Sequence, residues 1–324
     1  MTYHNQSLAD LKFLITGGAG FIGSNLVQYL LDHGAGHVRV LDNLSNGYKE
    51  NITPFLSAQN FEFIEGDICD LQTCKDAMEG MDYVSHQAAL GSVPRSINDP
   101  ITSNSVNVSG FLNMLVAQNE SDTVKRMVYA ASSSTYGDSK SLPKVEDRIG
   151  KPLSPYAVTK YVNELYADVF YKTYGTQTIG LRYFNVFGPK QSPNGAYAAV
   201  IPLFMNAVKN NEPPTIHGDG SQTRDFTFVQ NAVEANIRGM FAGDEAVNEV
   251  YNIAFGDRIS ILDLWEHLAD LSATDIQPTF GETRRGDVKD SLADIGKAKR
   301  LLGYDPQYSV KQGLGVTWEY FKAH

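Results

Sequence analysis

Three glycines near the start of the chain have the spacing of a turn that can bind a pyrophosphate. Gly17, Gly20 and Gly23 follow an apolar run at residues 11–16 and precede a helical pattern. Gly17 would allow the tight turn, Gly20 would let the backbone approach the phosphates, and Gly23 would let the helix pack closely on the strand. Gly18 can replace Gly17 in a second register, and both registers direct the N–H groups of the helix start at the phosphates. The stretch therefore predicts dinucleotide binding.

Two carboxylates follow the next predicted strands. Asp42 ends a strand at residues 38–42, roughly 20 residues past the turn, where a carboxylate can hydrogen bond to the adenosine ribose. Because its charge would repel a 2′-phosphate, Asp42 favours NAD over NADP. Asp67 falls at the end of a strand predicted at residues 61–68 and could accept a hydrogen bond from the adenine amino group. It could equally cap the helix that follows, and the sequence leaves both roles open.

A tyrosine and a lysine form the next reactive pair. Tyr156 and Lys160 are four residues apart and therefore share one face of a helix, which Ser154 would cap. Tyr136 also has a lysine four residues further on, but Gly137 follows it directly and predicts a turn that would separate the two side chains. We therefore predict that Tyr156, and not Tyr136, acts together with a lysine.

Small and polar residues gather where predicted strands end. Ser132, Ser133 and Ser134 follow a strand at residues 127–131, and open α/β sheets bind ligands at the carboxyl ends of their strands. Turn formation alone could explain any one of these serines. His86 lies in the strand predicted at residues 83–89, but a lone histidine there is more often a core residue than a catalytic one. We therefore predict a site that contains the serines and excludes His86.

The composition of the 324 residues excludes several classes of protein. A net charge of −10 argues against nucleic acid and anionic membranes as partners, because both require a basic surface. No apolar run approaches the roughly 18 residues of a membrane-spanning helix, and the first ten residues are too polar for a signal peptide. Cys69 and Cys74 lack a second pair of ligands, so neither a disulfide framework nor a metal site is expected. These observations favour a cytoplasmic protein with free thiols.

Alternating strand and helix signals predict an α/β fold of the Rossmann type, a doubly wound parallel sheet with helices on both faces. One long helix is expected from about Asn98 to Asn119. After residue 184 the elements become shorter, which suggests an NAD-binding domain at residues 1–184 and a smaller α/β substrate domain at residues 185–324. A segment at about 226–256 is expected to return to the first domain.

The second part of the chain carries arginines that suit a pyrophosphate. Arg224, and Arg284 with Asp287 nearby, are candidate ligand groups, because the forked guanidinium binds oxyanions through two donors at once. Each arginine alone would more often form a surface ion pair. A nucleotide-sugar ligand would explain both arginines, because both could bind its pyrophosphate.

In this order the motifs resemble the extended short-chain dehydrogenase/reductase family. More closely the chain resembles UDP-hexose 4-epimerases, and most closely the bacterial UDP-N-acetylglucosamine 4-epimerases of surface-polysaccharide synthesis. The resemblance extends from about Leu11 to Tyr304. It rests on the glycine turn, the two strand-end acids, the Gln87-Ala88-Ala89 run, the serine cluster, the Tyr156/Lys160 pair, Tyr183-Phe184-Asn185, Arg224 and the stretch at residues 284–294.

The resemblance implies a mechanism for the predicted site. Tyr156, as phenolate, would take the proton of the sugar 4-hydroxyl while NAD accepts hydride from C4, and the 4-keto sugar would turn over before the hydride returns. A free tyrosine has a pKa of about 10, too high for a base at neutral pH. Lys160 and the nicotinamide charge would lower this pKa, and Lys160 would also bind the nicotinamide ribose. Ser132 would hydrogen bond to the 4-oxygen. The resemblance further implies a homodimer formed through the helices after Asn98 and Ser154.

The resemblance also assigns ligand contacts residue by residue. The cofactor contacts are Gly17, Gly20, Phe21, Ile22, Gly23, Asp42, Asn43, Ser45, Asn46, Gly47, Asp67, Ile68, Gln87, Ala88, Ala89, Asn107, Tyr156, Lys160 and Tyr183. The substrate contacts are Ser133, Ser134, Asn185, Gln191, Ala199, Val200, Thr215, His217, Arg224, Arg284, Asp287 and Ser291.

Three positions discriminate between related activities. Similar 4,6-dehydratases and decarboxylases carry acids where this chain has Ser133 and Ser134, so no net elimination is expected. Epimerases restricted to non-acetylated sugars carry a tyrosine at the position of Ser291, and a serine would leave room for an N-acetyl group. We therefore expect 4-epimerisation of UDP-N-acetylhexosamines. The alternatives are UDP-glucose/UDP-galactose epimerisation, epimerisation of a UDP-N-acetylhexosaminuronic acid, a nucleotide-sugar reductase, or a non-catalytic NAD-binding protein.

Overall fold

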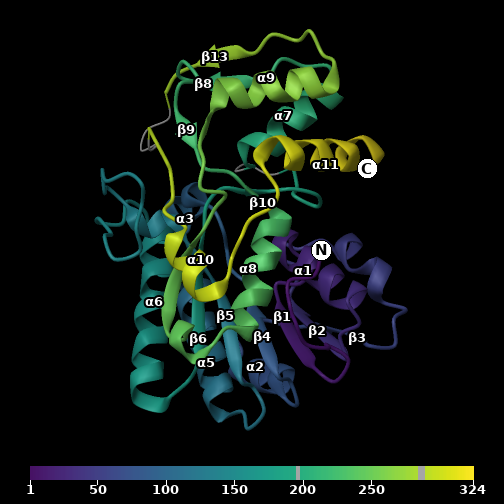
Figure 1. Ribbon diagram of the computed structural model, residues 1–324, viewed down its shortest axis with the longest axis vertical. Helices are drawn as coiled ribbons and strands as arrows, with labels where there is room; N and C mark the ends of the chain where they lie inside the picture. Colours follow the sequence, from purple (N-terminus) through teal and green to yellow (C-terminus); the bar gives the residue numbers. More distant parts are fainter. Residues whose placement is uncertain (195–197, 284–288) are drawn as a thin grey trace.

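A parallel sheet forms the centre of the molecule. The computed structural model describes residues 1–194, 198–283 and 289–324 (Figure 1). Its seven-stranded sheet has the order β11-β6-β5-β4-β1-β2-β3, and every pairing in it is parallel. The strands are β1 (Lys12–Thr16), β2 (His37–Asp42), β3 (Phe61–Glu65), β4 (Tyr83–His86), β5 (Arg126–Ser132), β6 (Thr178–Tyr183) and β11 (Glu249–Ile253). The winding direction reverses between β1 and β4, which confirms the doubly wound fold and predicts a ligand site there.

The central strand β1 contributes apolar side chains to both faces of the sheet. Phe13 and Ile15 of β1 pack in one core and Leu14 in the other, as the twofold period of a strand requires. The first core is covered by α1 (Phe21–Asp32), α8 (Val229–Phe241) and α10 (Gly296–Leu302). The second is covered by α2 (Leu71–Met78), α5 (Phe111–Glu120) and α6 (Pro155–Tyr174).

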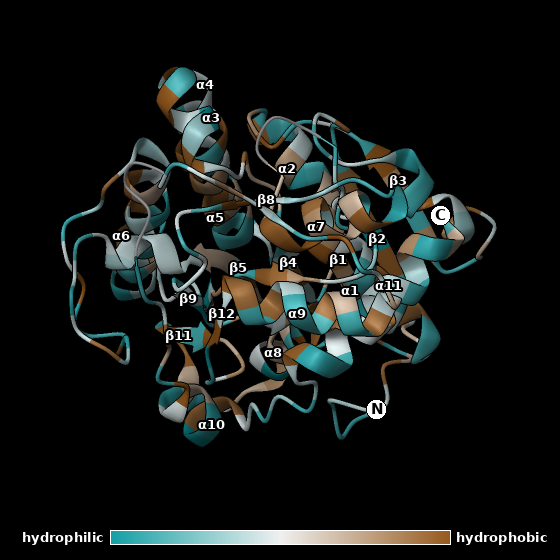
Figure 2. Ribbon diagram, turned by 90° about the horizontal axis from the view of Figure 1, so that it is seen from above, coloured by the Kyte–Doolittle hydropathy of each residue, from teal (hydrophilic) through white to brown (hydrophobic). Residues whose placement is uncertain are grey.

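A smaller layer lies above the carboxyl edge of the sheet (Figure 1). Its core contains Phe204, Trp265 and Trp318, from three helices that pack on one another. The helices are α7 (Val200–Lys209), α9 (Ile261–Ser272) and α11 (Val310–Ala323), and the short strands are β7 (Val186–Phe187), β8 (Thr215–His217), β9 (Thr223–Arg224), β10 (Thr227–Phe228), β12 (Ile259–Ser260) and β13 (Thr279–Gly281). Seen from above, apolar residues concentrate at the centre of the molecule and polar residues around its rim (Figure 2).

The prediction of one long helix from about Asn98 to Asn119 is wrong in its bounds and in its continuity. The structure has α3 (Val93–Asn98), a break, α4 (Pro100–Asn104), a π-helical turn (Ser105–Gly110) and then α5. Asp99 caps α4 by accepting a hydrogen bond from the Thr102 N–H, and Pro100 occupies the first turn. Proline disfavours helical backbone in the residue before it, which explains the break.

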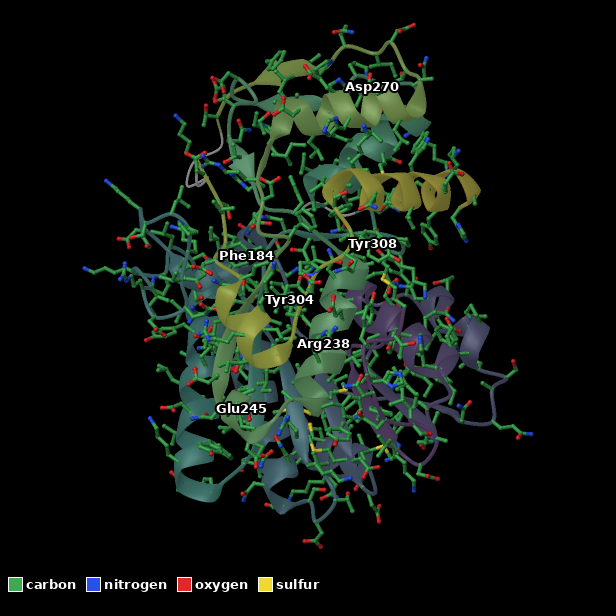
Figure 3. All side chains as sticks on the ribbon, in the orientation of Figure 1. Phe184, Arg238, Glu245, Asp270, Tyr304 and Tyr308 are labelled. Atoms are coloured by element: carbon green, nitrogen blue, oxygen red, sulfur yellow. The ribbon has the colours of Figure 1, made fainter. Side chains whose placement is uncertain are left out.

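Two later segments return to the large sheet. Strand β11 pairs with β6, and α8 packs on the same face as α1. The segment after Ser291 also returns, because Ile295 and Ala298 lie in the first core and the buried Tyr304 hydroxyl donates to the Ala254 carbonyl over 2.8 Å (Figure 3). The sequence did not predict this second return, and the boundary at 184/185 stays a prediction. None of the helices in the described part of the chain is long and apolar enough to cross a membrane.

Candidate active site

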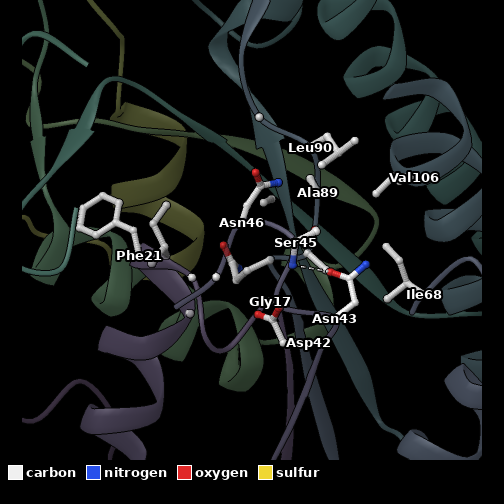
Figure 4. A pocket seen from close by; sticks show the side chains of 18 of the residues that line it. Gly17, Phe21, Asp42, Asn43, Ser45, Asn46, Ile68, Ala89, Leu90 and Val106 are labelled. Atoms are coloured by element: carbon white, nitrogen blue, oxygen red, sulfur yellow. Dashed lines mark hydrogen bonds between the residues drawn. The ribbon is translucent and has the colours of Figure 1, made fainter. Parts of the chain in front are cut away.

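A cavity of about 430 Å³ lies at the carboxyl edge of the large sheet. The strand order places Tyr183, Ser132, Gln87, Gly17 and Asp42 one after another along this edge. Every predicted cofactor residue except Asn107 contributes to the cavity wall, and so do Ser132, Tyr156 and Lys160. Figure 4 shows the part of the wall around Asp42, with Leu90 and Val106 opposite. The carboxyl edge thus joins the predicted nucleotide and catalytic residues in one space.

The glycine turn forms a cradle that side chains would fill. Gly17 has a φ of +69°, and a Cβ there would lie 2.7 Å from the Ala88 nitrogen. A Cβ on Gly23 would lie 2.8 Å from the Gly18 Cα. Helix α1 begins at Phe21, and its N-cap residue Gly20 has no side chain to cap it, so the first N–H groups of the helix are available to an anion. This cradle fits a pyrophosphate.

Asp42 is buried at the end of β2 and already holds two backbone amides. Its carboxylate accepts from the Ala19 N–H over 3.0 Å and from the Leu44 N–H over 2.8 Å. Burial raises the pKa of this carboxyl, and the two amide hydrogen bonds oppose the shift. Each oxygen retains a lone pair for a ribose hydroxyl, whereas a phosphate at this position would meet a buried acid. The geometry fits NAD.

Asp67 lies two residues beyond the end of β3, which is shorter than predicted. Its carboxylate accepts from Asn43 Nδ2 over 2.9 Å and from the Cys69 N–H over 2.8 Å. Asp70, not Asp67, caps the following helix α2, so the capping alternative for Asp67 is wrong. The adenine role of Asp67 stays a prediction.

Two predicted cofactor residues are engaged with other parts of the protein. Asn107 lies behind the wall, where its side-chain amide bonds to the Leu90 N–H (2.7 Å), the Leu90 carbonyl (3.1 Å) and Thr159 Oγ1 (3.2 Å). It therefore orders Leu90, a wall residue that the sequence analysis missed. Asn46 does face the cavity, but its Oδ1 accepts from the Arg95 guanidinium over 2.6 Å.

The ends of β5 and α6 bring the reactive groups together. Ser132 is the last residue of β5, and its Oγ accepts from the Ser134 N–H (3.1 Å) and Ser134 Oγ (2.9 Å). Tyr156 lies in the first turn of α6, which Ser154 caps as predicted. Ser132 and Tyr156 both line the cavity, and the Ser132 hydroxyl acts to lower the pKa of the Tyr156 phenol. Lys160 follows one turn later and donates to the Ala130 carbonyl over 2.7 Å.

Burial shifts the pKa values of Lys160 and Tyr156. It lowers the pKa of Lys160 to about 8, while the negative charge of Glu164 acts in the opposite direction. It raises the pKa of Tyr156, and the hydrogen bond from Ser132 only partly offsets this. The expected lowering of this pKa by Lys160 is not found in the protein alone, and a positive charge acting on the phenol is needed to make it a base.

Tyr136 and His86 are buried and hydrogen bonded to other side chains. The buried Tyr136 hydroxyl donates to Asn252 Oδ1 over 2.6 Å, and its ring lies 4.9 Å from the Arg182 guanidinium carbon. His86 Nδ1 shares a hydrogen bond with Thr16 Oγ1 over 2.8 Å, and burial lowers the pKa of the imidazole to about 3. Each side chain is held inside the protein, in agreement with the sequence analysis.

A second cavity, of about 540 Å³, adjoins the first and shares Asn185 and Val186 with it. Its wall includes the predicted substrate residues Asn185, Ala199, Val200, Thr215, His217 and Arg224. Apolar side chains of α7 and Phe226 complete it, among them Leu203, which the sequence analysis missed. The amphipathic repeat of α7 was visible in the sequence, but a repeat alone does not distinguish a core from a cavity wall.

The remaining predicted substrate residues are absent from the described walls of the cavities or lie outside the described residues. Gln191 donates to the Val186 carbonyl over 3.1 Å, and the Ser291 N–H donates to the Thr223 carbonyl over 3.1 Å, next to Arg224. Ser133, Ser134, Gln191 and Ser291 are absent from the described linings of both cavities. Arg284 and Asp287 lie outside the described residues.

Comparison with known proteins identifies the family. Residues 13–254 match the NAD dependent epimerase/dehydratase family. A UDP-N-acetylglucosamine 4-epimerase from Methanobrevibacter ruminantium M1, solved with UDP-N-acetylmuramic acid, is 37% identical, with a TM-score of 0.92 over 97% of this chain and 99% of that one. A UDP-glucuronic acid 4-epimerase from Bacillus cereus, solved with UDP-glucuronic acid and NAD, is 32% identical, with a TM-score of 0.89 over 97% of this chain and 99% of that one. A putative UDP-glucose 4-epimerase from Methanocaldococcus jannaschii is 35% identical over 312 residues, which are 94% of this chain and 97% of that protein.

The chain belongs to the NAD-dependent epimerase/dehydratase family. It is an enzyme, and its cofactor is NAD. The predicted family, fold and cofactor are therefore confirmed. The three relatives differ in the sugar that their names give, so membership of the family does not decide which sugar this enzyme uses.

Proposed function

We propose that this enzyme interconverts UDP-N-acetylglucosamine and UDP-N-acetylgalactosamine by inverting C4. Its wider class is that of the NAD-dependent UDP-sugar 4-epimerases, to which its relatives belong. The observation that carries the proposal is the junction of the two cavities at Asn185 and Val186, beside a wall that contains Ser132, Tyr156 and Lys160. A dinucleotide in the first cavity and a sugar nucleotide in the second would meet at these groups.

The residues of the first cavity divide the binding of NAD among them. The N–H groups at the start of α1 would hold the pyrophosphate, Asp42 the adenosine ribose and Lys160 the nicotinamide ribose. Bound NAD supplies the hydride acceptor for the oxidation of C4, the hydride donor for its reduction, and a positive charge beside Tyr156. That charge, together with Lys160, would lower the pKa of a phenol that burial otherwise raises.

Proton transfer falls to Tyr156 and Ser132. Tyr156 Oη would accept the proton of the sugar 4-hydroxyl, and Ser132 Oγ, which lines the same cavity, would hold the 4-oxygen during the transfer. The same Tyr156 would return the proton to the 4-oxygen once the keto sugar has presented its other face. Arg224 would bind the diphosphate of the substrate and anchor it while the sugar ring turns.

The neighbours of Ser132 restrict the chemistry to this carbon. Ser133 and Ser134 follow it directly, and neither hydroxyl is an acid or base of the kind that water elimination requires. Ser134 is further engaged, because both its N–H and its hydroxyl donate to Ser132 Oγ. Oxidation and re-reduction at C4, without elimination, is the reaction that this arrangement supports.

The acetylated sugar is proposed from the small side chain at Ser291. The N–H of Ser291 donates to the Thr223 carbonyl, and the residue after Thr223, Arg224, lines the second cavity. An acetamido group needs volume beside C2 of the sugar, and a serine leaves more of it than a phenol would. The runner-up is the plain UDP-glucose/UDP-galactose pair, followed by a UDP-N-acetylhexosaminuronic acid.

A substrate panel tests the proposal. The pure protein is incubated with UDP-N-acetylglucosamine, UDP-glucose or UDP-N-acetylglucosamine uronic acid, with no cofactor added, and the products are identified by NMR. We expect the C4 epimer of UDP-N-acetylglucosamine to form fastest. A faster reaction of either other sugar nucleotide would overturn the substrate assignment, and a product with an eliminated water would overturn the reaction.

A single substitution tests the role of Ser291. Ser291→Tyr should remove activity on the acetylated pair by filling the space of the acetamido group, and it should retain activity on the plain hexose pair. The quantity to compare is the ratio of kcat/KM values for the two pairs, because specificity is a difference of transition-state affinities. An unchanged ratio would show that residues other than Ser291 form the boundary of the acetamido site.

A further inference from the structure

A buried polar network lies behind the wall of the first cavity, the proposed NAD site, on the side of Ser132, Tyr156 and Lys160. It joins Gln87 and Tyr183, which both line the cavity, to Ser85 of β4 and Asn236 of α8. Ser85 and Asn236 are completely buried. Because β6 pairs Tyr183 directly with Ser132, the network lies on the catalytic side of the cavity and not on the Asp42 side.

One backbone carbonyl fixes the direction of every hydrogen bond in this network. Asn236 has a contact of 2.8 Å with the Ala232 carbonyl, and a carbonyl can only accept, so Asn236 must turn its Nδ2 toward it. The second N–H of Asn236 then donates to Tyr183 Oη over 2.7 Å. The proton of Tyr183 must therefore point elsewhere, and it reaches Gln87 Oε1 over 3.2 Å.

The orientation of Gln87 follows from these bonds. With Oε1 turned toward Tyr183, its Nε2 donates to Asn236 Oδ1 over 3.0 Å and to Ser85 Oγ over 2.9 Å. The Ser85 hydroxyl completes the arrangement by donating to Asn236 Oδ1 over 3.0 Å. Burial raises the pKa of Tyr183 to about 12, so its phenol keeps the proton that the network requires.

The side chains of Gln87 and Tyr183 can only accept further hydrogen bonds. Both N–H groups of Gln87 and the O–H of Tyr183 are used inside the protein, which leaves lone pairs on Gln87 Oε1 and on Tyr183 Oη. This part of the wall can therefore accept hydrogen bonds from a ligand and cannot donate them. The nicotinamide nucleoside of NAD carries matching donors, the ribose hydroxyls and the carboxamide N–H groups.

We propose that Asn236 is a positioning residue that fixes the Gln87 amide with its oxygen as the acceptor for the nicotinamide nucleoside of NAD. This inference rests on the first cavity being the NAD site, as in the proposed function. Asn236 acts through Gln87 and Tyr183 from the far side of the wall, and it is brought there by the segment that returns to the sheet after Asp225.

A competition between two nucleotides tests the proposal without any sugar substrate. The full chain is equilibrated with NAD and ADP together, filtered rapidly and denatured, and both bound nucleotides are quantified. ADP shares the adenosine and the diphosphate of NAD but lacks the nicotinamide nucleoside. The ratio of bound NAD to bound ADP therefore reports the nicotinamide end alone, and ADP-ribose as a third competitor separates ribose contacts from carboxamide contacts.

The critical variant is Asn236→Asp, which keeps the shape of the side chain but cannot donate from a carboxylate oxygen to Ala232 or Tyr183. We expect the preference for NAD over ADP to fall roughly three- to tenfold, the value of about one hydrogen bond. The matched control is Asn231→Asp on the same helix. Asn231 is equally buried and bonds to the Tyr308 backbone (2.8 and 3.2 Å), away from the described walls of both cavities. The control should lose a similar amount of stability and keep the wild-type ratio.

The outcomes separate positioning from general damage. A structural defect would weaken both nucleotides alike, so an unchanged ratio in Asn236→Asp, or an equal change in Asn231→Asp, would overturn the proposal. If Asn236→Asp does not fold, Gln87→Met removes the acceptor directly and should lower the same ratio; a wild-type ratio in that variant would also overturn it. A wild-type chain that does not prefer NAD over ADP would instead refute the assignment of the first cavity.

Discussion

At the scale of single residues, Tyr136 and Tyr156 have different surroundings, although each has a lysine four residues further on. Tyr156 lies with Ser132 in the wall of the first cavity, whereas Tyr136 is bonded to Asn252 in the interior. We predict that Tyr156→Phe lowers kcat by several orders of magnitude and leaves KM nearly unchanged, because the lost hydroxyl acts on the proton in the transition state. Steady-state kinetics on the preferred sugar nucleotide measure both constants.

Tyr136→Phe is the matched control for this prediction. It removes a buried hydrogen bond to Asn252 and should therefore lower the free energy of unfolding by about 1–3 kcal/mol, with kcat largely retained. Near-normal turnover in Tyr156→Phe, or an equal loss in both variants, would reject Tyr156 as the base.

The residues that sequence reasoning found are those whose role depends on neighbours along the chain. The glycine turn, Asp42 at a strand end, and Tyr156 behind the Ser154 cap all belong to local patterns, and the structure brings them to one cavity. Asn107 and Asn236 could not be assigned in this way. Apart from Ala232, which is close to Asn236 in the sequence, their partners lie 17 or more residues away, so only the folded chain shows which groups they hold.

At the scale of elements, Asp225 joins three segments around the substrate cavity. It lies between β9 and β10, is completely buried, and accepts from the N–H groups of Phe255 (3.1 Å), Gly256 (3.3 Å) and Ala293 (3.1 Å). Burial raises the pKa of this carboxyl to about 7, although the three amides act in the opposite direction. The carboxyl therefore links the loop after β11 to the stretch that follows Ser291.

This pKa predicts how stability depends on pH. Between about pH 4 and pH 7 the folded state holds a proton on Asp225 that the unfolded state releases, so the contribution of this group to stability falls as the pH rises and levels off above pH 7. Asp225→Asn removes the titration. We expect the difference in unfolding free energy, wild type minus variant, to be smaller at pH 8 than at pH 5 in urea titrations. A difference that does not change with pH would mean that the buried carboxyl is ionised throughout this range.

The elements themselves were only partly predictable. The start of α6 was predicted, because capping residues are local signals. The break at Asp99 had a signal as well, since proline follows it. The π-helical turn at Ser105–Gly110 and the return of α10 to the first core had none, because both depend on packing between distant segments.

At the scale of the whole molecule, one side of the large sheet carries exposed apolar side chains. Ile97 and Ile101, on α3 and α4, are 60% and 82% exposed, and Val158, Leu165 and Val169 of α6 are 48%, 49% and 53% exposed. Helices α3 and α4 pack against α6, and in Figure 1 α3 and α6 lie on the side away from α11. Exposed apolar patches of this kind indicate a protein interface.

We predict that this surface joins two copies of the chain in a homodimer. The three α6 side chains share one helix face, and a two-fold axis would bring the same face of a second copy against it, so that each patch covers the other. Leu165→Glu with Val169→Glu would place two charges of the same sign from each copy into the contact, on a protein whose net charge is already −10. Light scattering after size-exclusion chromatography should report a dimer for the wild type and a monomer for this double variant. Val316→Glu on α11, at a side chain 46% exposed but outside this patch, should remain dimeric. A monomeric wild type, or a double variant that stays dimeric, would assign the patch to another partner.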